Sequence, residues 1–170
     1  MEMTLRERLE KLLNAYSHHY DIARDVEVDG GRFPASAFYF MRDEHYLIRR
    51  DKKFYAIEQH DYTYFDVVEN LDAETLEARI DLSRRAGLGQ VKPHKEHMCS
   101  YVTLVILADA ITPEAVKRIK RTRFRKNFLF SFHGWMEYRI AAMDCSAMRF
   151  YSNPAGRDPR KTLEQNFKGH

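Results

Sequence analysis

The feature that most constrains the fold is a nearly continuous apolar run at residues 101–108. Its longest apolar stretch, residues 102–108, contains one polar side chain, Thr103, and is far too short to span a bilayer. Because apolar and polar side chains barely alternate along the run, a strand at this position must be covered on both faces. The run therefore predicts the central strand of a sheet with helices packed on it.

Residues 35–69 show a different pattern, in which apolar side chains recur at every second position. Tyr, Phe and Ile are frequent here, as a half-buried pleated surface favours. We predict four short strands, at residues 36–42, 45–50, 54–60 and 62–69, with turns at residues 43–44, 51–53 and 60–61. Such short connections join neighbouring antiparallel strands, so the segment is predicted to be a meander.

Capping signals predict helices on both sides of this meander. Residues 4–20 carry one apolar stripe and begin with Thr4 and Glu7, which have the spacing of a capping box. After the meander, Asp72 is placed to cap a second helix. We expect that helix to end at Gly87, acting as the C′ glycine.

The residues that follow the central strand predict a further helix and strand. Thr112 as N-cap and Pro113 at the first helical position predict a helix that ends near Thr122. Residues 127–132 are predicted to form the next strand. A strand, a helix and a strand with short links favour a right-handed crossover between parallel strands.

The remaining segments complete one predicted domain over residues 1–170. Residues 29–31 indicate a loop, residues 135–143 and 148–152 a hairpin, and residues 158–167 a last helix. The fold class predicted from this element order is α+β, with a mixed, largely antiparallel sheet.

Composition is typical of a soluble globular protein, with 44% hydrophobic and 31% charged residues. The N-terminal residues lack the apolar region of a signal peptide. The two cysteines, Cys99 and Cys145, provide no disulfide framework. We therefore expect a cytoplasmic protein without a membrane contact.

Charge is distributed unevenly along the chain. Residues 1–100 contain 15 Lys and Arg against 19 Asp and Glu, whereas residues 101–170 contain 13 against 6. The basic excess is concentrated in residues 117–126, the basic segment, whose cations are Lys117, Arg118, Lys120, Arg121, Arg123, Arg125 and Lys126. One interpretation is that the acidic part of the fold neutralises this segment. The other is that it binds nucleic acid or an acidic protein, which makes the chain a non-enzymatic binding or regulatory module.

A second candidate site lies in the meander. If residues 50–53 form a hairpin turn, His45 faces Glu58 and Asp43 faces His60. Two imidazoles and two carboxylates on one face could hold Zn, Mn or Fe, or act as an acid–base pair. The simpler interpretation is a set of cross-strand ion pairs.

The order helix, antiparallel strands, helix and strand resembles the core of the PD-(D/E)xK nucleases. Asp51 followed by Glu58-Gln59-His60 loosely matches their acid, acid-x-Lys signature, with His60 where the family carries lysine. The resemblance implies a metal-dependent hydrolase as the alternative function. A turn residue at Asp51 would lie about 20 Å from Glu58, so Asp43 is the better partner of Glu58.

Two weaker patterns complete the candidates. His94, His97 and Cys99 have the chemistry of zinc ligands, but a second pair at zinc-site spacing is lacking. The aromatic residues of the meander favour a core face, base stacking or a homo-oligomer interface. No Gly-rich phosphate loop, Ser-centred elbow or cofactor motif is present, so no cofactor is expected and it stays open whether the chain is an enzyme.

Overall fold

The computed structural model describes residues 2–43, 57–92, 97–129 and 134–169. Their elements, in chain order, are α1 (Leu5–Tyr16), β1 (Asp21–Val28), β2 (Gly31–Asp43), β3 (Ile57–Leu71), α2 (Ala73–Gln90), β4 (His97–Ile111), α3 (Pro113–Arg121), β5 (Arg125–Asn127), β6 (Trp135–Asp144), β7 (Arg149–Ser152), a 3₁₀ turn (Pro154–Gly156) and α4 (Arg157–Phe167). None of the helices in these residues is both long and apolar enough to cross a membrane.

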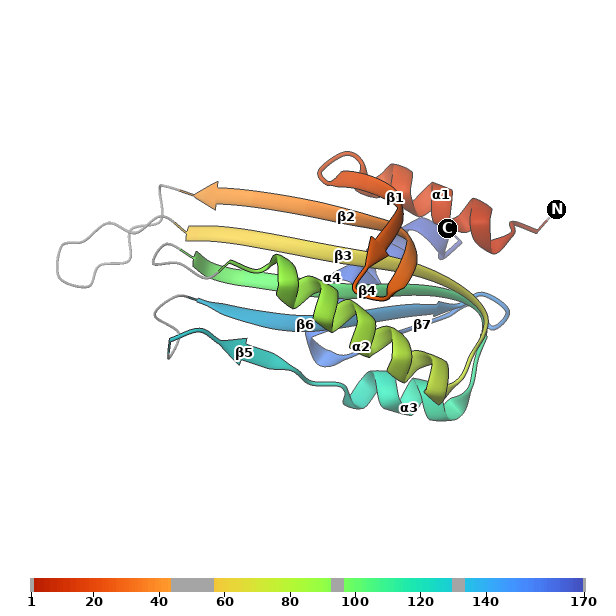
Figure 1. Cartoon of the computed structure of the whole chain (residues 1–170). Coiled ribbons are helices and arrows are strands. Elements are labelled where there is room, and N and C mark those ends of the chain that lie inside the picture. Colours follow the sequence, from red (N-terminus) through yellow and green to blue (C-terminus); the bar gives the residue numbers. More distant parts are fainter. Residues whose placement is uncertain (1, 44–56, 93–96, 130–133, 170) are drawn as a thin grey trace.

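The strands form one mixed sheet in the order β1-β2-β3-β4-β6-β5, and β7 also pairs with β6 (Figure 1). The pairs β1–β2, β2–β3, β5–β6 and β6–β7 are antiparallel, whereas β3–β4 and β4–β6 are parallel. The predicted α+β class with a mixed, mostly antiparallel sheet is therefore confirmed.

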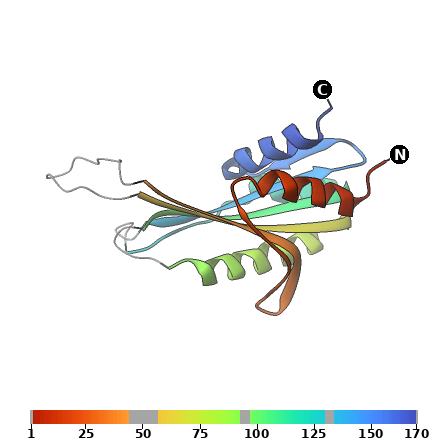
Figure 2. The same ribbon diagram turned by 90° about the horizontal axis from the view of Figure 1, so that it is seen from above.

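Helices cover both faces of this sheet, which Figure 2 shows nearly edge-on, with α1 and α4 on one side and α2 on the other. On the α2 and α3 face, Leu76 and Ile80 of α2 and Ile119 of α3 are buried in one core with Leu104 and Ile106 of β4. The even-numbered side chains of β4 thus pack against this layer of helices.

The opposite face has a second core. Leu12 of α1 and Leu163 of α4 are buried there with Phe65 of β3 and Val105 and Leu107 of β4. Because β4 supplies side chains to both cores, the predicted central strand that is covered on both faces is confirmed.

The helix starts follow the capping signals closely. The Thr4 and Glu7 side chains form the reciprocal capping box of α1, and Asp72 accepts from the backbone of Thr75 at the start of α2. Thr112 caps α3 in the same way, with Pro113 at its first position. The predicted hairpin of β6 and β7 and the predicted last helix are also present.

The predicted end of α2 was wrong. The helix runs through Gly87 and ends at Gln90. A Cβ atom at position 87 would lie 2.4 Å from Cγ1 of Val102 in β4, so glycine is required here for close packing of helix on strand. A glycine that permits a close approach looks the same in a sequence as one that ends a helix.

The strand predictions also failed at two places. Residues 21–28, for which no element was predicted, form β1 and turn into β2 at Gly30, whose φ is +84°. No turn interrupts β3 at His60 and Asp61. The predicted strand at residues 45–50 and the turns beside it lie outside the described residues.

The crossover prediction named the wrong parallel partner. The strand after α3 is the short β5 at residues 125–127, and it pairs antiparallel with β6 rather than parallel with β4. The parallel neighbours of β4 are β3 and β6. Edge strand β5 pairs with the first residues of β6, so α3 and β5 together follow one edge of the sheet (Figure 1).

Candidate functional site

The basic segment spans α3 and β5. The apolar face of α3 is fixed by Ala115 and Ile119, which are fully buried, so the cationic side chains of this helix point away from the core. Arg118 is half-buried and forms an ion pair with Glu77 of α2. It also donates a hydrogen bond to the Thr122 hydroxyl at 3.1 Å. Arg118 is therefore held within the fold.

The other six cations of the segment are exposed: Lys117, Lys120, Arg121, Arg123, Arg125 and Lys126. None of them forms an ion pair with a carboxylate of the described residues. Several lie over aromatic rings instead: the Arg125 guanidinium is 5.0 Å from the Trp135 ring centre. The segment thus presents free cations beside aromatic surface.

The carboxylates of residues 1–100 that form ion pairs in the described structure, apart from Glu77, bind arginines of the same half. Glu10 binds Arg24 at 2.8 Å, Glu27 binds Arg32 at 2.7 Å, and the buried Asp66 binds Arg79 at 2.8 Å. A further pair of carboxylates, Asp29 and Asp81, binds Arg85 at 2.9 Å. Among the described residues, Arg118–Glu77 is the ion pair that joins the acidic half to the basic segment.

The predicted metal cluster does not have the predicted register. Asp43 of β2 pairs with Ile57 of β3 and not with His60, and Glu58 pairs with Arg42. A carboxylate oxygen of Glu58 lies 3.5 Å from Arg42 and the other 3.3 Å from His60. His45 lies outside the described residues. Within those residues, no group of three or more His, Cys, Asp or Glu is placed to hold a metal ion.

The structure agrees with the PD-(D/E)xK nuclease resemblance only in the order of its helices and strands. The order helix, three antiparallel strands, helix and parallel strand is present. Asp51 of the proposed signature and His94 of the zinc hypothesis lie outside the described residues. Cys99, which belongs to the same hypothesis, is buried on β4.

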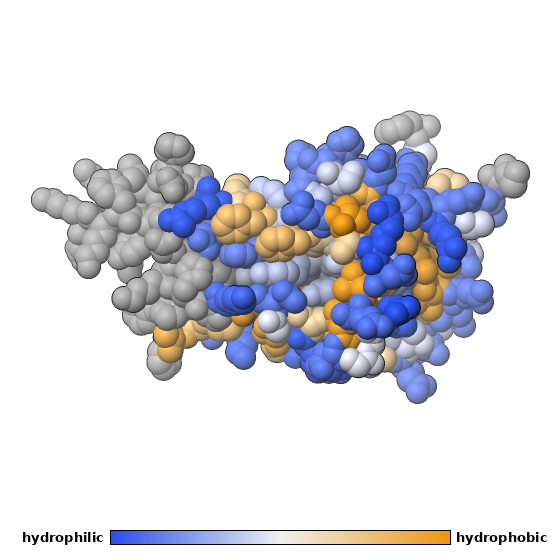
Figure 3. Space-filling view, turned by 45° about the horizontal axis from the view of Figure 1, so that its top comes forward, coloured by the Kyte–Doolittle hydropathy of each residue, from blue (hydrophilic) through white to orange (hydrophobic). Residues whose placement is uncertain are grey.

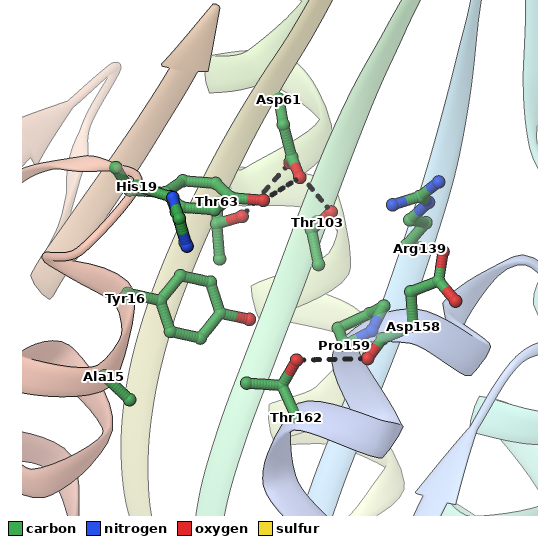
Figure 4. A pocket seen from close by; sticks show the side chains of 11 residues that line it. Ala15, Tyr16, His19, Asp61, Thr63, Thr103, Arg139, Asp158, Pro159 and Thr162 are labelled. Carbon is green, nitrogen blue, oxygen red and sulfur yellow. Dashed lines mark hydrogen bonds between the residues drawn. The ribbon is translucent and has the colours of Figure 1, made fainter.

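The structure also contains a cavity that the sequence did not predict. It has a volume of about 170 Å³ and lies between the C-terminal end of α1 and the N-terminal end of α4 (Figure 4). Its floor is formed by β3, β4 and β6, which contribute Asp61, Thr63, Thr103 and Arg139. Both helices pack on this face of the sheet, so the cavity is the space that they leave open.

Asp61 is the central polar group of this cavity, although only 5% of its surface is exposed. Its Oδ2 accepts a hydrogen bond from the Tyr20 hydroxyl at 2.7 Å. Its Oδ1 accepts from Thr63 at 3.2 Å and from Thr103 at 3.3 Å. Burial raises the pKa of Asp61, while Tyr20, Arg139 and the two threonines oppose that increase by favouring the charged form.

Two further polar groups face the cavity. The Arg139 guanidinium lies 3.3 Å from the centre of the Tyr101 ring and has no ion pair with any described carboxylate. The Tyr16 hydroxyl has no hydrogen-bond partner in the described part of the chain, and Figure 4 shows it pointing into the cavity. Burial and the Asp61 charge raise the pKa of Tyr16, so its hydroxyl stays protonated.

This site was not predicted from the sequence, because His60 and Asp61 have the pattern of a turn. One signal pointed to it: Thr103 is the polar residue within the longest apolar run of the chain. A hydroxyl at that position must find a buried partner, and Asp61 on the adjacent strand is that partner.

Residues 4–165 match the family described as Domain of unknown function (DUF8052). The chain belongs to this family. The matched region extends from the capping box of α1 almost to the end of α4, so it contains the basic segment and every residue that lines the cavity. No curated protein and no solved structure matches the chain.

Proposed function

We propose that this DUF8052 protein is a non-enzymatic binding module that contacts nucleic acid through its basic segment. The observation that carries the proposal is the charge pairing. Six exposed cations of the segment have no carboxylate partner among the described residues, while the carboxylates of residues 1–100 that do form ion pairs there, apart from Glu77, bind arginines of the same half. The fold therefore leaves the basic charge available to an outside partner.

The shape of the segment supports a polyanion. With a rise of about 1.5 Å per residue on α3 and about 3.3 Å along β5, residues 117–126 extend over roughly 20 Å of the sheet edge. A stripe of that length faces several successive phosphates of a nucleic acid. Aromatic rings beside the cations, such as Trp135 below Arg125, add surface on which bases can stack.

The test is the binding of fluorescent single-stranded and double-stranded oligonucleotides at several salt concentrations. Loss of phosphate contacts weakens binding and reduces its salt dependence. The double variant Lys120→Glu with Arg121→Glu is therefore expected to bind at least about tenfold more weakly. The double variant Arg6→Glu with Lys11→Glu on α1 changes the net charge equally at exposed positions and should leave binding unchanged.

Two results would contradict the proposal. One is equal weakening by both double variants, which indicates attraction by net charge alone. The other is no binding of either oligonucleotide, together with binding of an acidic polypeptide that the α3 variant abolishes. That result would assign the segment to an acidic protein.

A cytoplasmic location belongs to the same proposal. Cys99 and Cys145 are both free and buried, as a reducing compartment permits. The hydrolase alternative, nuclease-like or not, would use Asp43, His45, Glu58 and His60. His45 lies outside the described residues, and Glu58 and His60 contact each other at 3.3 Å.

Self-association is a second contact that one observation favours. Phe40 of β2 is 48% exposed and its ring centre lies 4.9 Å from that of His60, next to the stacked rings of Phe38 and Tyr62. Figure 3 shows hydrophobic side chains at the molecular surface. Sedimentation of the wild type against Phe40→Ser tests this homo-oligomer interface directly.

A further inference from the structure

The cavity between α1 and α4 contains two opposite charges that do not touch each other. Asp61 is on β3 and Arg139 on β6, and β4 lies between these strands. Arg139 is in register with Thr63, two residues beyond Asp61, so the two backbones are roughly 12 Å apart. Asp61 and Arg139 form no ion pair within 4.0 Å in the described structure, although the positive charge of Arg139 does stabilise the Asp61 carboxylate. The two opposite charges therefore lie apart from each other, and both line the cavity.

The hydrogen bonds around Asp61 leave part of the accepting capacity of its carboxylate unused. A carboxylate offers about four lone-pair positions. The hydroxyls of Tyr20, Thr63 and Thr103 occupy three of them, so one acceptor position remains.

Of two hydroxyl groups that line the cavity, one has a hydrogen-bond partner among the described residues and the other has none. Thr162 is engaged, because its hydroxyl donates to the backbone carbonyl of Asp158 at 3.2 Å. The Tyr16 hydroxyl, on a side chain that is 8% exposed, has no partner among the described residues and points into the cavity (Figure 4). The hydroxyl oxygen itself is open to the cavity and is not closed off from solvent, so a ligand in the cavity can form a hydrogen bond with it. Tyr16 is thus positioned for a group that enters the cavity.

The size and charge of the cavity define the group that fits. A cavity of about 150 Å³ is known to hold benzene, so this one, at about 170 Å³, suits a molecule of about six heavy atoms. A simple anion would pair Arg139 but leave Asp61 without a counterion, and a simple cation would do the reverse. A molecule that carries one charge of each sign pairs both at once.

We propose that this cavity binds a small zwitterion with the chemistry of an α-amino acid. Its ammonium group faces the open lone pair of Asp61, and its carboxylate faces the Arg139 guanidinium and the Tyr16 hydroxyl. Asp158, which is exposed at the rim, disfavours a ligand with a second negative charge. The site is thus selective for small side chains without a negative charge. This proposal does not depend on nucleic-acid binding by the basic segment.

The test is calorimetric titration of the full chain with L-alanine, acetate and ethylamine, each at the same ionic strength. Alanine is expected to bind at least about tenfold more tightly than acetate or ethylamine, because each of these lacks one of its two charged contacts. L-Aspartate should bind more weakly than alanine because of Asp158. Equal binding of acetate and alanine would overturn the proposal in favour of an anion site, and equal binding of ethylamine would do so in favour of a cation site. No binding of alanine would also overturn it.

Two variants separate a binding role from a structural one. Tyr16→Phe keeps the ring that packs on Tyr20 and Phe65 and removes only the unpartnered hydroxyl, so the fold should persist. It is expected to weaken alanine binding by about fivefold, the effect of one hydrogen bond. Arg139→Met should abolish binding, whereas the control Tyr151→Phe, outside the cavity, should leave it unchanged.

Thermal unfolding of each variant shows whether it is folded. If Arg139→Met fails to fold, Tyr16→Phe still tests the proposal. Alanine binding that is unchanged in a folded Tyr16→Phe variant contradicts the assigned role of the hydroxyl and overturns the site as drawn.

Discussion

Two neighbouring rows of side chains on one face of the sheet differ completely in character. The polar row consists of Thr63, Thr103 and Arg139, in register across β3, β4 and β6. Two residues further along the same strands, the apolar row consists of Phe65, Val105 and Ala141. The strand residues of both rows are almost fully buried apart from Arg139, so burial alone does not distinguish them.

The difference lies in what covers each row. The apolar row packs in a core with Leu12 and Leu13 of α1 and Leu163 of α4. The polar row lies below the cavity, where its two threonine hydroxyls donate to Asp61. A continuous strand can therefore pass from a packed core to a polar site within two residues, provided that each buried hydroxyl has a partner.

The largest expected effect is in the apolar row. Phe65 is fully buried and packs edge-on against the Tyr16 ring, with ring centres 5.0 Å apart. Phe65→Ala should lower the free energy of unfolding by about 3–5 kcal/mol, because it removes apolar contacts and leaves a cavity. Urea denaturation measures this loss. The comparison fails if Thr63→Ala, in the polar row, destabilises the chain equally.

A smaller effect is expected from exchanging the character of the rows along β4. Val105→Thr introduces a hydroxyl into the apolar row, which packs in a core of apolar side chains from α1 and α4, and should cost about 1–3 kcal/mol. Thr103→Val removes one of three donors to Asp61 and should cost about 1 kcal/mol. Both values come from denaturant titrations. A larger loss in Thr103→Val than in Val105→Thr would contradict the distinction between the rows.

The smallest and most gradual effect concerns pH. Because burial raises the pKa of Asp61, the folded chain binds this proton more tightly than the unfolded chain does. Its contribution to stability is therefore complete below the unfolded pKa of about 3.9 and is lost as the pH rises through the higher folded-state pKa.

The measurement is the free energy of unfolding across this pH range for the wild type and Asp61→Asn, which cannot titrate. The wild-type value minus the variant value should fall as the pH rises. A difference that is constant or increases would show that the hydroxyl donors and Arg139 outweigh burial at Asp61.

Features that depend on neighbouring residues in the chain were predictable. The capping box of Thr4 and Glu7 and the N-caps at Asp72 and Thr112 are local hydrogen bonds between a side chain and the backbone a few residues away. The central strand was equally clear, because its lack of alternation requires cover on both faces. These signals led to the correct fold class.

Features that depend on distant residues were not predictable in this way. In the sequence Asp61 resembles a turn residue, whereas in the structure it is buried and accepts hydrogen bonds from Tyr20 and from Thr103 of β4. Gly87 resembled a helix end until Val102 was seen to occupy the space beside it. The register of β2 on β3 was likewise assigned from a turn expected at residues 50–53, and pairing Asp43 with His60 was therefore wrong.

The sequence by itself determined the helix starts, the buried central strand and the concentration of cations in residues 117–126, because each is a property of residues adjacent in the chain. Only the tertiary structure decided which charges are paired and which remain free. It also decided that Asp61, Arg139 and Tyr16, from two strands and a helix, line one cavity. The physical reason is that the partners of a charged or buried polar group are set by packing between elements far apart in sequence, which local patterns do not encode.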